Sequence, residues 1–560
     1  MKKRILKWSL LLIFPLLISG CSDFLTEEPL AASSKENYYR TPYQLQEALN
    51  GVYDILQSNL YNNCEWIFGE ACADDVIGND EGTANQIAEL VNFRFNTSNN
   101  WILNRYTVNY RGINRVNQVI ANVNKVKLAS NDYGNYTTVR EILGQAKFLR
   151  AMFYFNLVKT YGGVPIRPET ETIDKLIIPR STKEQVYAYI EKDLREAAIM
   201  VQSKYTDGNL GKAGRGSVIG LLMKVLMYQA TPGVSSQKWE DMVELGDYFV
   251  GGKAMTLGEI LRFGENSDED WESLRKRLWF KPAAISSATD PVELPSGVLG
   301  AIANQYGVEY TVIYGDALNY WEIFTQKGEF YRGSVFEVMF KESADGTTDD
   351  QNDGTGIFQD LYLTRMWTSP TLFDVIKNDP RVSQVIVRGG TGTPDGERVE
   401  ANDSRYVCLK WYTPKRERPL YSDDYARNRR VMRYPEILLM YAEALNETGR
   451  GADALVQLNK VKSAANKINS TATLYTSGGY GYMRDQIWSE RRLELCHEWD
   501  RFFDIVRQGR ASKVFRAFAS ESATNHKRGQ YFVEGVNEIF PIPQTEIDLS
   551  NGVVTQNPGY

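Results

Sequence analysis

Histidine, the side chain most often used in acid–base catalysis, occurs only twice in these 560 residues, as His497 and His526. A Ser-His-Asp triad would have to use one of them, and no Gly-x-Ser-x-Gly turn is present. His497 lies beside Glu494 and Glu498 in a segment with helical periodicity, which favours a structural role. His526 lies in a polar run, and no His-Glu-x-x-His zinc signature occurs. The sequence therefore predicts no histidine-based or zinc-based catalytic site.

Carboxylates leave two possibilities open. Glycoside hydrolysis needs only a pair of them, and 70 acidic residues cannot exclude such a pair, so a surface glycosidase remains an alternative. The polar tract 349–354, rich in Asp and Asn, offers oxygen ligands for Ca²⁺ but lacks the Glu that ends an EF-hand loop. We expect no cofactor, with a structural calcium ion in this tract as the one open exception.

The cysteines divide into one at the N-terminus and four in the body of the chain. Cys64, Cys72, Cys408 and Cys496 are too few for a disulfide scaffold, although a Cys64–Cys72 pair in an oxidising compartment stays an alternative to free thiols. Residues 1–20 combine basic residues with a short apolar run and read as a signal peptide. The run Leu-Ile-Ser-Gly at 17–20 before Cys21 matches a lipobox, which predicts lipidation of Cys21. Two or three acyl chains there would hold residues 21–40 to a membrane as a tether.

Aromatic residues are the features that suit binding. The faces of sugar rings stack on flat aromatic rings, while polar side chains satisfy the hydroxyl groups. Trp101, after a Thr-Ser-Asn-Asn run, and Trp367 are the best candidates among several tryptophans outside the strongest helical stripes. The alternative for each tryptophan is a place in the core. The net charge is −6 and no basic stripe occurs, so nucleic acid is not an expected partner.

Helical periodicity dominates two parts of the chain, 41–250 and 431–560. Paired helices with short loops favour a mainly α fold, a tetratricopeptide-like superhelix without a fixed 34-residue register. Between them, 251–430 is irregular, with strand-like runs at 335–340 and 405–412, and we expect ligand loops there. Helices are expected at 43–59, 106–127, 142–161, 181–201, 216–228, 238–249, 434–447, 452–467 and 482–506. Beyond the signal peptide, no apolar run is long enough to cross a membrane.

Several long motifs, in order along the chain, resemble those of the SusD/RagB lipoproteins. The run GQAKFLRA at 144–151, followed by YGGVP at 161–165, is similar to the family's GEAKFLRA…YGGVP signature. The run RYPEILLMYAEA at 433–444 resembles RYAEVLLMYAEA, with Pro435 in place of Ala, and ERRLEL at 490–495 precedes a matching RFFD segment at 501–504. The charged residues of these motifs lie on helices with apolar faces, so we interpret them as ion pairs between helices. This set is Arg150, Glu443, Glu490, Arg491, Glu494 and Arg501.

The resemblance implies a superhelix with an irregular second region, anchored in the outer membrane and exposed at the cell surface. It implies binding without cleavage, and a SusC-like TonB-dependent transporter as the partner to which a glycan is delivered. A peptide-binding RagB-type protein with the same partner is the alternative.

The resemblance also places ligand residues in two regions, 64–104 and 265–370. In the first the tentative residues are Asp74, Asp75, Asn99, Asn100 and Trp101, and in the second Tyr320, Trp321 and Trp367.

Overall fold

The computed structural model describes residues 38–78, 86–128, 132–170, 176–251, 318–342, 366–399, 405–419, 425–468, 473–520 and 528–560. Cys21 with the signal peptide, most of the tether, and the acidic tract 349–354 lie outside these residues. None of the helices in the described ranges combines the length and the apolar character needed to cross a membrane.

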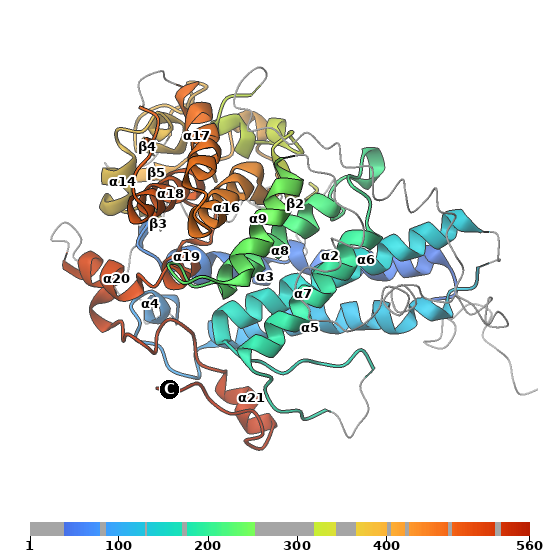
Figure 1. The fold of residues 1–560 in the computed structure, drawn as a ribbon. Helices are drawn as coiled ribbons and strands as arrows, with labels where there is room; N and C mark the ends of the chain where they lie inside the picture. Colours follow the sequence, from blue (N-terminus) through green and yellow to red (C-terminus); the bar gives the residue numbers. More distant parts are fainter. Residues whose placement is uncertain are drawn as a thin grey trace, which may run out of the picture.

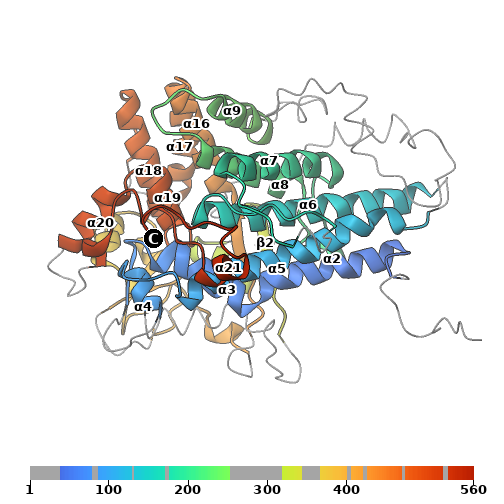
Figure 2. The ribbon, with the colours of Figure 1, turned by 90° about the horizontal axis from the view of Figure 1, so that it is seen from below.

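The N-terminal part is a stack of helices joined by short connections. They are α2 (Pro42–Gln57), α3 (Asn59–Trp66), α4 (Gln86–Val91), α5 (Asn100–Asn122), α6 (Tyr133–Tyr161), α7 (Lys183–Met200), α8 (Arg215–Gln229) and α9 (Gln237–Phe249). A π-helical turn, η3 (Ile67–Ala71), continues α3. Figure 2 shows α2, α5, α6, α7 and α9 lying successively across the molecule, with α8 beside α7. α2 packs on α5, α5 on α6, α6 on α7, α7 on α8 and α8 on α9, which is the arrangement of a helical superhelix.

The C-terminal part continues the same stack, because α9 packs directly on α16 (Tyr434–Glu447), which packs on α17 (Gly451–Asn466) and α18 (Tyr480–Leu495) (Figure 1). The irregular segment between α9 and α16 therefore leaves the superhelix without interrupting it. The other helices of this half are α14 (Pro370–Ile376), α15 (Val382–Val385), α19 (Arg501–Arg507), α20 (Ala511–Ser520) and α21 (Gln544–Leu549). Short 3₁₀ turns include η4 (Val123–Lys125), η6 (Asp207–Asn209), η8 (Trp321–Phe324), η9 (Gln326–Gly328), η10 (Lys415–Glu417) and η11 (Arg528–Tyr531).

The described residues form three antiparallel strand pairs, and two of them join the irregular segment to other parts of the chain. They are β1 (Val76–Gly78) with β3 (Met366–Thr368), β2 (Ser334–Val338) with β6 (Arg429–Arg433), and β4 (Ile386–Arg388) with β5 (Tyr406–Cys408). The first pair joins the segment after α3 to the irregular region, and the second joins that region to the start of α16. Each strand is only three to five residues long, so the pairs fix connections and form no extended sheet.

The hydrophobic core follows the helices, and two smaller clusters lie in the irregular region. The main cluster runs from α2 through α9 to α16–α19. One small cluster surrounds Tyr320 and Leu372, and the other surrounds Trp321 and Leu409. Gly69 in η3 is required by close packing, because a Cβ there would lie 1.8 Å from the carbonyl oxygen of Trp499. That contact holds η3 directly against the turn between α18 and α19.

The mainly α superhelix predicted from the sequence is confirmed, with helix ends mostly within a few residues of those expected. Three details differ. α7 begins at Lys183, two residues after the expected start, and Thr182 and Gln185 form its capping box. The helix expected at 482–506 is divided, because His497 and Trp499 adopt left-handed backbone angles (φ 62° and 69°) between α18 and α19. Cys64, Cys72, Cys408 and Cys496 are all buried free thiols, so the Cys64–Cys72 alternative is not found. The division at 41–250, 251–430 and 431–560 remains a prediction.

The ion pairs predicted between helices are present for Arg150, Glu443 and Arg491, whereas the nearest ion-pair partners of Glu490, Glu494 and Arg501 lie outside the helices. Arg150 of α6 pairs with Asp193 of α7 at 2.7 Å, and Arg507 of α19 pairs with Glu443 of α16 at 2.8 Å. The remaining pairs of the predicted set are Glu490 with Arg381, Arg491 with Asp504, Glu494 with Arg433, and Arg501 with Asp74. Partners such as Arg381 and Asp74 come from outside the helices, so the network also binds the irregular region and the β1 segment.

We expect Arg433→Met to destabilise the protein strongly. The Arg433 side chain is fully buried and lies 2.9 Å from Glu494 and 2.5 Å from Glu498, and removing one partner of a buried pair costs about 3–5 kcal/mol. Urea unfolding measures the change in the free energy of unfolding. Arg516→Met is the matched control, since its pair with Glu534 is exposed and its loss should cost no more than about 1 kcal/mol. Equal stability of the two variants would contradict the role given to the buried network.

Candidate functional site

The structure brings together parts of the two predicted ligand regions. In the β1–β3 pair, Ile77 lies opposite Trp367 and Val76 opposite Thr368. Just beyond the strands, the Ser369 hydroxyl donates a hydrogen bond to the Asp74 carbonyl at 2.6 Å. Residues nearly three hundred positions apart thus form one local unit.

Asp74 and Asp75 are placed inside this unit and do not face solvent. Asp74 lies 2.8 Å from Arg501 and 3.0 Å from Arg492, and Asp75 lies 2.7 Å from Arg492. Burial alone would raise the pKa of the Asp74 carboxyl, but the charges of Arg492 and Arg501 outweigh it and hold the pKa below its usual value. The two carboxylates therefore anchor β1 to α18 and α19, and this placement does not support their assignment as ligand contacts.

Asn99, Asn100 and Trp101 lie at the start of α5. Asn99 is buried and caps the helix, since its side-chain oxygen accepts a hydrogen bond from the Trp101 amide at 3.0 Å. Its amide nitrogen is also used, donating to the Gln86 carbonyl at 2.9 Å. Asn100 is exposed, and Trp101 is half-buried against the main core. Only Asn100 and part of Trp101 are accessible to a ligand in this group.

Tyr320 and Trp321 are interior residues of the irregular region. The Tyr320 hydroxyl donates to the carbonyl of Glu494 at 3.0 Å, and the Trp321 indole NH donates to the carbonyl of Leu409 at 3.1 Å. Both rings are almost completely buried, in two different clusters. Their contacts explain both residues as packing, and their burial argues against stacking on a sugar.

The Trp367 ring is buried, and one of its faces lies against the exposed side chain of Arg405. The guanidinium carbon of Arg405 lies 3.6 Å from the centre of the Trp367 ring, and Arg405 is exposed. The ring is 5% exposed, so the arginine rather than the core closes one of its faces. An exposed cation–π contact contributes about 0.5–1 kcal/mol. Among the predicted ligand residues with buried rings, Trp367 is the one that, within the described residues, has an exposed arginine so close to its ring.

A groove along α5 offers a second surface, which the sequence analysis did not identify. Its volume is about 940 Å³, and one wall is a polar face of α5 at helical spacing. The other wall consists of the segment 167–170 with Leu176 and Glu546. The exposed or half-exposed side chains on the α5 wall are Thr107, Tyr110, Arg111, Asn114, Gln118 and Ala121. Amides, a hydroxyl and a guanidinium are suited to neutral, hydroxyl-rich ligands.

Thr368, His497 and Glu70 form an array that resembles a catalytic triad. Nε2 of His497 lies 3.0 Å from the Thr368 hydroxyl, and Nδ1 lies 3.0 Å from the Glu70 carboxylate. Burial raises the pKa of Glu70. All three side chains are almost fully buried, so no substrate reaches the hydroxyl. The burial of this array supports the structural role predicted for His497. Its two partners, Glu70 and Thr368, could not be identified from the sequence because they come from two other, distant elements.

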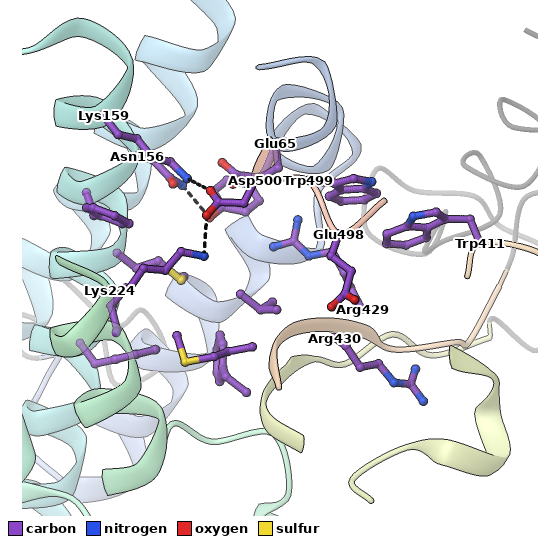
Figure 3. A pocket seen from close by; sticks show the side chains of 18 residues that line it. Glu65, Asn156, Lys159, Lys224, Trp411, Arg429, Arg430, Glu498, Trp499 and Asp500 are labelled. Carbon is purple, nitrogen blue, oxygen red and sulfur yellow. Dashed lines mark hydrogen bonds and ion pairs between the residues drawn. The ribbon is translucent and has the colours of Figure 1, made fainter. Parts of the chain in front are cut away.

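A smaller cavity lies between the two halves of the superhelix (Figure 3). Its volume is about 70 Å³. Lys159 of α6 and Lys224 of α8 converge on Asp500, at 3.4 and 3.0 Å, with Arg429 of β6 on the other side of the cavity. Trp411 and Trp499 stack face to face at its edge, with their ring centres 4.2 Å apart. The sequence analysis did not identify this charged cavity, because its residues come from distant segments.

Among the described residues, no group of three or more His, Cys, Asp or Glu side chains is arranged to hold a metal ion. The acidic tract 349–354 lies outside those residues, so the structural calcium ion stays a prediction.

The comparisons with known proteins agree with one another. A model of the SusD family matches residues 325–560, and a model described as "Starch-binding associating with outer membrane" matches residues 23–226. SusD-like protein P2 of Formosa agariphila is 23% identical over 569 residues, covering 98% of each chain. SusD-like protein P25 of the same organism is 22% identical over 506 residues, covering 88% of this chain and 87% of that protein.

Solved structures share the fold over nearly the whole chain. A laminarin-binding SusD-like protein superposes with a TM-score of 0.66 at 24% identity, covering 93% of this chain and 100% of that one. Surface glycan-binding protein A from Bacteroides thetaiotaomicron, in complex with laminarihexaose, superposes with a TM-score of 0.65 at 20% identity, covering 92% and 99%. At these identities the likeness shows a common fold.

We expect the anchoring role of Asp74 to show in the pH dependence of stability. Its pKa is lower in the folded than in the unfolded protein, so its contribution is complete above the unfolded value near 3.8 and disappears as the pH falls through the folded value. Wild type should exceed Asp74→Asn in unfolding free energy at pH 7, by about 3–5 kcal/mol, and approach it in acid.

Denaturant unfolding at several pH values measures this difference. Asp453→Asn is the control, because its pair with Arg450 is largely exposed. A difference between wild type and Asp74→Asn that stayed constant from pH 7 to pH 2 would show that the ion pairs with Arg492 and Arg501 do not account for it.

Proposed function

We propose that this chain, which belongs to the SusD family, is a surface lipoprotein that binds a glycan and delivers it to a SusC-like TonB-dependent transporter without cleaving it. The observation that best supports this proposal is that two related family models together match most of the chain. One of them is described as "Starch-binding associating with outer membrane". Solved relatives of the same fold are named for laminarin binding or are in complex with laminarihexaose.

The Trp367–Arg405 unit is the proposed glycan platform. It lies where the two predicted ligand regions meet, and the ring becomes available when the exposed arginine moves. Anchoring of β1 by Asp74 and Asp75 keeps the paired strand β3, and with it Trp367, in a fixed position before a ligand arrives. A rigid aromatic platform lowers the entropy lost on binding.

We expect substitutions of this pair to change glycan affinity in opposite directions. Trp367→Ala removes the platform and should weaken binding by about 1–3 kcal/mol, on the scale measured for base–aromatic stacking. Arg405→Ala removes the cover, so the ligand no longer has to displace it, and should strengthen binding by about 0.5–1 kcal/mol. Calorimetry of the soluble chain, from Ser22 onward, against β-glucans such as laminarin oligosaccharides measures both changes.

Tyr43→Ala, which removes an aromatic side chain that is 71% exposed on α2, is the matched control and should bind as wild type does. Because Trp367 is buried, circular dichroism must first show that its variant is folded, whereas Arg405→Ala tests the platform without that risk. Unchanged affinity in both folded variants would refute the platform. Loss of binding only in Asn114→Ala or Gln118→Ala would place the glycan in the α5 groove.

Two alternatives have their own readouts. A RagB-type peptide-binding protein would bind peptides in the same calorimetric assay and none of a panel of polysaccharides. A surface glycosidase would release reducing sugar from a glycan when incubated as the pure protein. The proposal expects glycan binding with neither of these outcomes.

The anchor and the transporter complete the proposal, although Cys21 lies outside the described residues. We expect Cys21→Ala to abolish labelling by radioactive fatty acid and to move the protein from the outer-membrane fraction to the soluble fraction, since the acyl chains supply the membrane affinity. Wild type should co-purify from solubilised membranes with a TonB-dependent transporter. Cys64→Ala is the control, because this buried thiol should affect neither lipid labelling nor localisation. Retention of the lipid label in Cys21→Ala would contradict the anchor.

A further inference from the structure

Arg429 is an unmatched charge in the interior. It lies on β6, opposite Val338 of β2, and is 5% exposed. Its Nε and Nη1 atoms have no hydrogen-bond partner, and no carboxylate of the described residues lies within 4.0 Å of it. The guanidinium carbon lies 5.6 Å from the ring centre of Tyr61 and 5.2 Å from that of Trp499. These rings cover its faces and leave two donors at its edge unused.

The three carboxylates that line the same cavity are already paired. Glu65 lies 2.9 Å from Arg105, and Asp500 lies between Lys159 and Lys224. Glu498 pairs with Arg433 at 2.5 Å and with Lys410 at 2.7 Å. Lys224 and Arg430 have further carboxylate partners outside the cavity, Glu436 at 2.9 Å and Glu337 at 3.6 Å. Among the described residues, Arg429 is therefore the cation of this cavity that has no carboxylate within 4.0 Å.

Such a charge is costly without a counter-ion. A guanidinium in a protein stays charged, and removal of an unpaired ion from water costs several kcal/mol. The two cation–π contacts recover part of this cost. A buried water molecule would accept a hydrogen bond from Nε or Nη1 but would not compensate the charge. An anion would accept the hydrogen bond and also compensate the charge.

The size of the cavity limits the anion. Its volume is about 70 Å³, and a space of about 10–15 Å³ on this scale holds one water molecule. The cavity is therefore large enough for a halide ion. Apolar side chains of α6 and β2, including Phe148 and Phe336, also line it. This favours a weakly hydrated monovalent ion over a multivalent one.

We propose that this cavity is a site for a small monovalent inorganic anion, of the halide class, bound by Arg429. The lining residues come from α3, α6 and α8 on one side and from β6 and the 498–500 turn on the other (Figure 3). The bound ion would therefore link the two halves of the superhelix. This inference is independent of glycan binding.

The first test compares thermal unfolding of the soluble chain in sodium chloride and in sodium gluconate at equal ionic strength. Gluconate is too large for the cavity. Wild type should unfold several degrees higher in chloride, with a midpoint that rises with the logarithm of chloride concentration, because the ion binds the folded state. Arg429→Met should remove this dependence, and Arg516→Met, an exposed arginine, should retain it. An equal chloride response in wild type and Arg429→Met would refute the site.

The second test does not depend on the folding of a variant. Crystals of the wild-type chain grown in sodium bromide should show an anomalous peak within hydrogen-bonding distance of Nε or Nη1 of Arg429. An ordered water molecule at that position without anomalous signal would refute the proposal, and it would do so even if Arg429→Met failed to fold.

Discussion

Buried charge pairing is the constraint on which the rest of this structure depends. Glu490 and Glu494 of α18 are fully buried, and each lies within 2.8 Å of Arg381 from the irregular region. Glu494 is also 2.9 Å from Arg433 at the start of α16. Such charges are tolerated in an interior only when their partners are in position, so each pair makes the placement of one element depend on another. Buried ion pairs thus join α18 both to the start of α16 in the superhelix and to the irregular region.

The same constraint positions the proposed glycan platform. Arg492 and Arg501 hold Asp74 and Asp75, which fix β1, and β1 fixes β3 with Trp367. The contact of Gly69 with Trp499 and the His497–Glu70 interaction attach η3 to the same turn. The proposed glycan-binding surface in the irregular region is therefore attached to α18 and α19 through buried ion pairs.

The interior also separates two uses of aromatic rings. Tyr320, Trp321, Trp411 and Trp499 are bound by hydrogen bonds or stacking inside the fold, whereas Trp367 is closed on one side only by an exposed arginine. Abundant tryptophan in the irregular region therefore indicates packing more often than ligand contact. An aromatic ring used for packing is covered by the core, whereas the ring of the proposed platform is covered by a solvated side chain.

Helical periodicity and the order of the charged motifs predicted the superhelix, most helix ends and the pairing of the buried charges. Local spacing determines which face of a helix is apolar, and a charge on such a face must find a partner. The sequence did not indicate which carboxylates would be anchors, because Asp74 and Asp75 meet Arg501 and Arg492 across more than four hundred residues. Nor did it indicate the division at His497, the cover on Trp367 or the unmatched charge of Arg429. Whether a side chain is exposed, and which group it pairs with, depends on contacts between segments that are distant in the sequence. Only the tertiary structure determines those contacts.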